Sequence, residues 1–180
     1  MWESYRAPAL ATARLVLEPV NAWHGESLFP LLKDPLLYTY IAKEPPLAAS
    51  HLSRSFEALE TRRSPDGAEL WLNWAVRISN GGYAGLVEAT VSADDTAQVA
   101  WWVFTASQRQ GYGREAVAEM LAHLAAIGVR EAVAFIDTRN TASIRLAEAL
   151  GFTRHETHMR REKVRGRWVD DHEYRRALSV

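Results

Sequence analysis

The sequence predicts one mixed α/β (α+β) domain with a mostly antiparallel central sheet and flanking helices. Strict apolar alternation over 70–78, followed by two further strand-like segments, indicates an antiparallel meander. A glycine turn at 111–113 then changes the spacing to that of a helix. The length of 180 residues and the apolar content of 48% suit one domain with an adequate core, which we expect to span 1–180.

The first half of the chain is expected to hold one strand and three helical segments. Alternation predicts the strand, and cap residues, proline and apolar spacing predict the helices. They are a strand over 12–20, a helix over 22–33 with Asn21 as N-cap and a kink or split at Pro30, a short helix over 36–41 after Asp34-Pro35, and a helix over 48–63.

The second half supplies the meander and a strand–helix alternation. Hairpin turns are expected at Asn80-Gly81-Gly82 and Asp94-Asp95, because glycine and acidic or amide residues favour such turns. The expected elements are strands over 70–78, 83–92 and 98–104, a helix from 114 that is closed by Gly128, a strand over 133–137, a helix from the Asn140 cap to Leu150 with a Schellman-type end at Gly151-Phe152, and two strands over 152–178.

Composition excludes several classes of function. The net charge of −1 argues against broad attraction to nucleic acid or membranes. No apolar run is long enough to span a bilayer, and the first residues lack a signal segment, so we expect a cytoplasmic protein. Cysteine is absent, which excludes disulfides and an acyl-cysteine intermediate, and we expect no metal site.

The segment Gln108-Arg109-Gln110-Gly111-Tyr112-Gly113 is the most informative part of the chain. An apolar strand precedes it and a helix follows it. Glycines let the backbone bend closely around a ligand, and the first helical turn leaves N–H groups free for an anion. The segment therefore predicts a phosphate site, although a GxG turn alone is structural more often than not.

A dinucleotide site is the first alternative. Gly111-x-Gly113-x-x-Ala116 fits a relaxed dinucleotide fingerprint, and Asp137 ends the next strand at about the right spacing. That fingerprint follows its strand at once and opens a run of parallel βαβ units. Here residues 105–110 intervene and the preceding strands are linked by hairpins, so the context disfavours a nicotinamide cofactor.

The segment together with its neighbours resembles the GNAT superfamily of acyl-CoA-dependent N-acetyltransferases. Gln108 to Gly113 matches that family's Q/R-x-x-G-x-G/A pyrophosphate loop, and Asn140 with Leu150-Gly151-Phe152 matches the second half of its cofactor site. The element order over 12–178 matches as well. The opening Thr12-Ala13-Arg14-Leu15, the Asn140-x-x-Ser143 pair, and Trp168 with Asp170 are most similar to the RimJ/RimL-type branch.

The resemblance implies acetyl-CoA as co-substrate and a role for specific positions. Gln108 belongs to the loop motif, and the loop amides that would cradle the pyrophosphate are those of Gln110, Gly111, Tyr112, Gly113 and Arg114. Val103 and Thr105 would pair with the pantetheine through their backbones, and the Val103 amide would act as an oxyanion donor. Asn140 would hydrogen-bond the pantetheine, or serve only as an N-cap.

The residues expected to act as catalytic acid and base depart from the pattern that the resemblance implies. Many family members carry a tyrosine acid in the second helix, where this chain has Ala147, so the resemblance to RimL-type enzymes makes Ser143 the expected proton donor to the CoA sulfur. Its alternative is a role in the first helical turn. Related sequences often place a glutamate where Gln98 stands, and Glu88 is the expected substitute, with a buried ion pair as its alternative. His155 and His158 lie near the expected acceptor edge, or simply face solvent.

The resemblance implies acetyl transfer to a small-molecule or peptide amine by direct attack in a ternary complex. An α-amine with a pKa near ~8 is about a tenth neutral at pH 7, whereas a lysine is below roughly 0.1% neutral. Because the chain offers few candidate general bases, the favoured acceptor is a protein N-terminal or aminoacyl α-amine. The six Lys and Arg residues between 154 and 167 either favour an acidic acceptor or form a solvated face.

Aromatic residues supply further candidates for the acceptor groove. Trp74 is expected in the core, whereas Trp71, Trp101 and Trp102 cannot all share one face. At least one of these three, and Tyr38 or Tyr40, is a candidate to line the groove. The alternative function is a catalytically weak acyl-CoA sensor with the same fold, and the sequence leaves a homodimer open.

Overall fold

One eight-stranded sheet organises the protein. The computed structural model describes residues 5–179, so residues 1–4 and 180 of the expected domain lie outside it. The strand order is β1-β2-β3-β4-β5-β6-β8-β7, and β5 with β6 is the parallel pair in this order. The strands are β1 (Leu10–Ala11), β2 (Leu15–Pro19), β3 (Leu70–Ile78), β4 (Tyr83–Val91), β5 (Thr96–Val103), β6 (Glu131–Asp137), β7 (Thr153–Val164) and β8 (Arg167–Ala177). The mixed fold class with a mostly antiparallel sheet is thereby confirmed.

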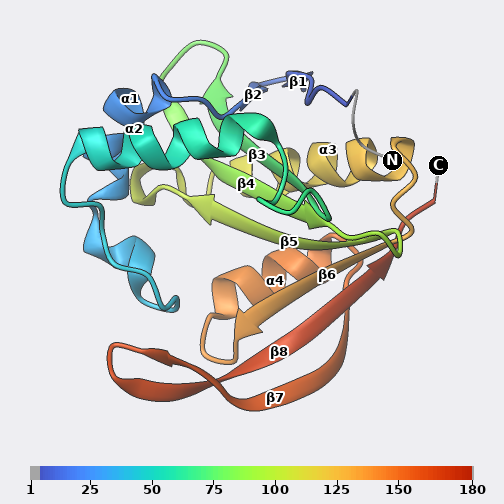
Figure 1. Cartoon of the computed structure of the whole chain (residues 1–180). Coiled ribbons are helices and arrows are strands. Elements are labelled where there is room, and N and C mark those ends of the chain that lie inside the picture. The colour runs from blue at the N-terminus through green and yellow to red at the C-terminus, as the bar shows by residue number, and fades with distance from the viewer. Residues whose placement is uncertain (1–4, 180) are drawn as a thin grey trace.

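Helices cover both faces of the sheet (Figure 1). One apolar core lies between the sheet and α3 and α4, and it contains Trp74, which is 0% exposed, as predicted. A second core, which includes Leu28, Phe56 and Leu86, lies under α1 and α2 on the other face. The helical elements are α1 (His24–Leu32), η1 (Pro35–Tyr38), α2 (Ala49–Ala58), η2 (Leu59–Thr61), η3 (Thr105–Ser107), α3 (Tyr112–Ala126) and α4 (Thr141–Ala149).

The first half of the chain corrects several predicted boundaries. The strand expected over 12–20 is shorter: β2 covers only Leu15–Pro19, because Thr12 turns toward α3, and the two-residue strand β1 precedes the predicted range. Asn21 is not the N-cap of α1: Trp23 holds that position, and the Asn21 side chain contacts the ring of His24 instead. Pro30 lies inside α1 without splitting it, and the helix ends two residues later.

Two further helical predictions were too long. The segment expected over 36–41 is the 3-10 turn η1, and the predicted cap is correct, since Asp34 accepts a hydrogen bond from the amide of Leu36. The helix expected over 48–63 ends as an α-helix at Ala58 and continues as η2 to Thr61. Arg62 then adopts a left-handed conformation (φ 59°), which ends the helical segment.

The second half agrees closely with the sequence. Asn140 caps α4 by accepting a hydrogen bond from the amide of Ser143 at 3.2 Å. The amide of Phe152 bonds the carbonyl of Ala147 and that of Gly151 bonds Glu148, which is the predicted Schellman arrangement. The helix expected from 114 begins two residues earlier, at Tyr112. No helix within residues 5–179 is both long and apolar enough to cross a membrane.

Candidate functional site

The sheet opens between its two parallel strands. β5 and β6 pair only at their beginnings, where Thr96 faces Glu131 and the last pair is Gln98 with Val133. Beyond that pair β5 stays bonded to β4, while β6 stays bonded to β8 as far as Asp137. Residues 99–103 of β5 and 134–137 of β6 therefore present facing edges that do not pair with each other, and an extended ligand can enter between them.

The end of β5 turns polar backbone groups toward this opening. The amide of Phe104 donates to the carbonyl of Ala84 on β4 at 2.9 Å. Successive N–H groups along a strand point to opposite edges, so the Val103 amide points away from β4 and toward the opening. The carbonyl of Val103 accepts a 3.2 Å hydrogen bond from the side chain of Gln108, which ties the strand end to the following loop.

The glycine loop ends at the N-terminus of α3. Gly111 is the N-cap of this helix with φ 83°, a left-handed conformation that glycine adopts without a steric penalty. The loop is held by a hydrogen bond of its own, in which the side-chain amide of Gln110 donates to the backbone carbonyl of Ala106. Within residues 5–179 the amides of 110–114 have no hydrogen-bond acceptor, and those of the first helical turn carry the positive end of the helix dipole.

Gly113 lets the loop approach the strand end closely. A Cβ at this position would lie 2.8 Å from a methyl group of Val103 and 3.4 Å from Leu146 of α4. A shallow pocket at this contact is lined by Trp101, Val103, Tyr112 and Gly113 among others. The free amides and the opening between β5 and β6 thus belong to one continuous site.

Arg14 holds the loop in place, a role that no local pattern around Arg14 predicts. Its guanidinium donates to the carbonyl of Gln110 at 3.0 Å, pairs with Glu115 at 2.6 Å and lies over the Tyr112 ring. Burial acts to raise the pKa of Glu115, but hydrogen bonds from Thr12 and Arg14 outweigh it, so the net pKa is lowered. A carboxylate in the first turn of α3 is thereby neutralised where a phosphate would otherwise meet like charge.

The start of α4 faces the opening from the β6 side. Asn140 and Ser143 are both half-buried, and the Ser143 hydroxyl has no hydrogen-bond partner in the part of the chain that the structure describes. Ala147, at the position where many relatives carry a tyrosine, is 0% exposed and belongs to the core. Ser143 is therefore the free hydroxyl in the first turns of this helix that is not fully exposed.

Glu88 lies on the face of the sheet that α1 and α2 cover. It is half-buried on β4, opposite Asn73 and Ala100. Among residues 5–179 no ion pair or hydrogen bond engages its side chain, so the buried ion pair considered as its alternative is not found there. Thr105, by contrast, donates its hydroxyl to Asp34 at 2.6 Å and joins the strand end to η1.

The segment after α1 approaches the same opening from the η1 side. The rings of Tyr38 and Trp102 meet edge to face with centroids 5.4 Å apart, and the ammonium of Lys43 lies 5.7 Å from the Trp102 ring. The guanidinium of Arg139, just after β6, lies over the ring of Tyr40. Trp102, Tyr38 and Tyr40 thus lie beside the opening, whereas Trp101 packs against Phe152 on the α4 side.

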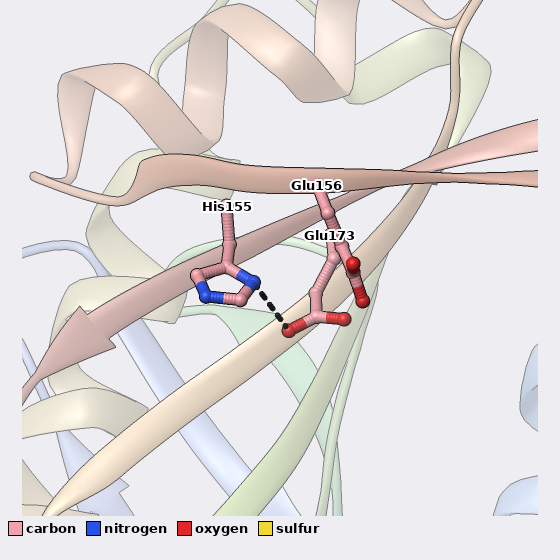
Figure 2. A group of neighbouring side chains, drawn as sticks. All are labelled: His155, Glu156 and Glu173. Carbon is pink, nitrogen blue, oxygen red and sulfur yellow. Dashed lines mark ion pairs between the residues drawn. The ribbon is translucent and has the colours of Figure 1, made fainter.

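A network of charged side chains links β7 and β8 in the C-terminal hairpin. Figure 2 shows His155 and Glu156 of β7 beside Glu173 of β8, the set whose atoms are close enough to approach one ion. The Glu173 carboxylate is already engaged, since it accepts from His158 at 2.6 Å and from Arg175 at 2.5 Å. A cation would have to displace the Arg175 guanidinium, so we assign these side chains to an ion-pair network.

The fold and the loop together define an acyl-CoA-binding class of protein, and comparison with known families agrees. Residues 14–153 match the acetyltransferase (GNAT) domain family. The chain belongs to this family and is a GNAT acetyltransferase, as the resemblance in the sequence predicted. The sequence matches none of the curated proteins with which it was compared.

Solved structures share the whole fold at low sequence identity. A RimL ribosomal L7/L12 α-N-protein acetyltransferase in complex with coenzyme A has a TM-score of 0.85 and 19% identity, over 95% of this chain and 98% of that one. The microcin C7 self-immunity acetyltransferase MccE, solved with acetyl-CoA and AMP, has a TM-score of 0.83 and 19% identity over 96% and 98%. A spermidine N-acetyltransferase from Vibrio cholerae, solved with CoA and spermine, has a TM-score of 0.80 and 16% identity over 93% and 97%.

Proposed function

We propose that this protein transfers the acetyl group of acetyl-CoA to an amine by direct attack, in a RimL-like manner. The observation that carries the proposal is the opening between β5 and β6, which leads to the unpaired amides at the start of α3. The amides of 110–114 would bind the pyrophosphate, and the edge of β5 would pair with the pantetheine as an added strand. Gly113, which permits the close approach to Val103, supports this assignment.

Chemistry would take place where the opening passes the end of β5. The Val103 amide, which points into the opening, would donate to the thioester oxygen and stabilise its negative charge in the transition state. The free hydroxyl of Ser143 would give its proton to the departing sulfur, and Asn140 would bond the pantetheine through its amide group. Glu88 is the base expected from the sequence, and its unengaged carboxylate keeps it a candidate.

The acceptor is proposed to be an α-amine, such as a protein N-terminus or an aminoacyl group. Such an amine is partly neutral at pH 7 and needs less help from a base than lysine does. Lys43 lies beside Trp102, and its charge supports an acceptor that carries negative charge near its amine. The AMP ligand of MccE and the protein substrate named for RimL are compatible with such a groove.

Steady-state release of CoA thiol from acetyl-CoA tests the proposal. The assay compares short peptides with free α-amines, of acidic and of neutral composition, with Nα-blocked peptides that offer only lysine. Turnover with α-amines above the rate of hydrolysis is the expected result. Tight CoA binding without turnover on any amine would instead favour the catalytically weak sensor, and binding of NAD(H) in place of CoA would overturn both.

A further inference from the structure

One buried carboxylate near the opening has no role in the site described so far. Asp171 of β8 is 5% exposed, and among residues 5–179 no group donates a hydrogen bond to it. The nearest cation is the Arg161 guanidinium, 3.8 Å away. Neighbouring buried acids differ, since Asp137 accepts three hydrogen bonds from Arg139 and Glu173 accepts from His158 and Arg175. Since no fully buried side-chain oxygen lacks a partner within residues 5–179, the unpaired oxygens of Asp171 keep contact with solvent, and a largely buried carboxylate that is still accessible is a candidate functional group.

Asp171 lies beside the end of β6 that borders the opening. It is the cross-strand partner of Asp137 on β6. The last β5–β6 pair is Gln98 with Val133, so Trp102 and Asp137 each lie four residues beyond the point where the two strands separate, and Trp102 comes one residue before Val103. Glu88 is level with Ala100, two residues farther back, or about 7 Å along the strand.

Asp171 also lies on the correct face of the sheet. Tyr174, three residues after Asp171 on β8, belongs to the core under α4 and donates its hydroxyl to Glu148 of that helix. Because side chains alternate along a strand, Asp171 and Glu173 lie on the opposite face. That is the face of Trp102 and Asp137, on which Tyr38 and Tyr40 approach the opening.

The surroundings partly enclose this position. The hairpin tip bonds η1 through Arg165, whose guanidinium donates to the carbonyl of Pro35 at 3.1 Å. β7 is bulged between His158 and Glu162, opposite Asp171 and Val169. The bulge places the Arg161 guanidinium over the Phe135 ring at 3.6 Å instead of directly on the Asp171 carboxylate. Bulges of this kind re-aim side chains beside active sites.

We propose that Asp171 is the general base that deprotonates the acceptor amine, an assignment that rests on the proposed function. A carboxylate oxygen takes a proton from the ammonium group, and the freed lone pair forms the C–N bond at the thioester carbonyl carbon. The C–S bond breaks, and the sulfur receives the hydroxyl proton of Ser143. The second amine proton leaves as the nitrogen becomes an amide and restores that hydroxyl. The products are the amide, CoA thiol and protonated Asp171, which releases its proton to water.

The charges around Asp171 support the assignment. Burial raises the pKa of the Asp171 carboxyl most, and the charges of Glu162 and Asp137 raise it further. The charges of Arg161 and His158 lower it, but the net shift is upward. Arg139 is held by Asp137 and so offers little compensation. A base with a raised pKa lies closer to the pKa of an ammonium group, which favours proton transfer. The same shift means that the charged carboxylate destabilises the native state once pH exceeds its folded pKa.

The test compares Asp171→Asn with Asp170→Asn and Glu88→Gln across pH. Asp170 is the matched control, because within residues 5–179 its side chain accepts one hydrogen bond, from the backbone amide of Arg160, through an oxygen that asparagine retains. With acetyl-CoA and a peptide that the wild type acetylates, kcat/KM of Asp171→Asn should fall about a hundredfold or more at pH 7 and lose its acid limb. CoA affinity should stay within twofold of the wild type, and Asp170→Asn should keep the wild-type profile.

A stability measurement gives a second, independent readout. Asp171→Asn should raise Tm at pH 7 to 8, and the difference from wild type should vanish at acid pH, where Asp171 is protonated. A lower Tm at neutral pH would make Asp171 a structural partner of Arg161 and overturn the proposal. So would an acid limb that persists in Asp171→Asn but is lost in Glu88→Gln. If the wild type itself acetylates no amine, the proposed function fails and this assignment fails with it.

Discussion

Replacing Ser143 with alanine separates the proposed acid from a merely structural serine. The hydroxyl has no partner within residues 5–179, and the hydrogen bond to Asn140 comes from the backbone amide, which alanine retains. Stability should therefore change by less than about 0.5 kcal/mol. A CoA thiol has a pKa near ~8.5, so its thiolate leaves more easily when a positioned donor protonates it at pH 7.

The expected kinetic loss follows from that donor. Positioned acids contribute about 10²–10⁴-fold, and because water replaces part of the effect we expect kcat to fall about a hundredfold at pH 7, or about 2.7 kcal/mol. KM for acetyl-CoA should change little, and the loss should shrink above pH 8.5, where the thiolate leaves without a proton. Thr141→Ala removes an exposed hydroxyl from the same helix and serves as the control. Equal kcat values for the two variants at pH 7 would refute the acid assignment.

Three further substitutions examine the glycine loop, the α4 cap and the Asp137–Arg139 ion pair. Gly111→Ala should lower stability by about 1–2 kcal/mol and CoA affinity, measured by calorimetry, at least tenfold. Gly128→Ala, at a glycine with φ 96° at the other end of α3, should lower stability alone. Equal CoA affinity in the two variants would show that the loop does not bind phosphate. Asn140→Ala should lower the free energy of unfolding in urea by about 1 kcal/mol through loss of the α4 cap, an effect that Asn140→Asp should not show. Arg139→Ala should cost about 1–3 kcal/mol at pH 7 because Asp137 loses its partner. Burial alone would raise the pKa of Asp137, but the hydrogen bonds from Arg139 lower it overall. The difference in stability between wild type and Arg139→Ala should therefore diminish as pH falls below about 4. A stability difference that is independent of pH would contradict the ion-pair explanation.

Elements governed by local chemistry followed the sequence most closely. The meander, the Asn140 cap and the Schellman end at Gly151-Phe152 depend on alternation, one side-chain acceptor and one left-handed glycine. Predictions that depend on tertiary contacts were less accurate. The strand expected over 12–20 begins only at Leu15 because Thr12 and Arg14 bind Glu115, about a hundred residues away. Asn21 contacts His24 instead of capping α1.

The sequence by itself determined the fold class, the family and the position of the glycine loop, because a strand, a glycine turn and a helix start are encoded in consecutive residues. Only the tertiary structure decided which groups meet at the reacting end of β5. Arg14 braces the loop from the far end of the chain. Asp171 lies beside the open end of β6 because β8 pairs with β6 as far as Asp137, whereas the β5–β6 pairing stops at Gln98 and Val133. Strand order and the length of a parallel pairing depend on packing across the whole sheet, so no local pattern around Asp171 distinguishes it from the exposed acids of the chain.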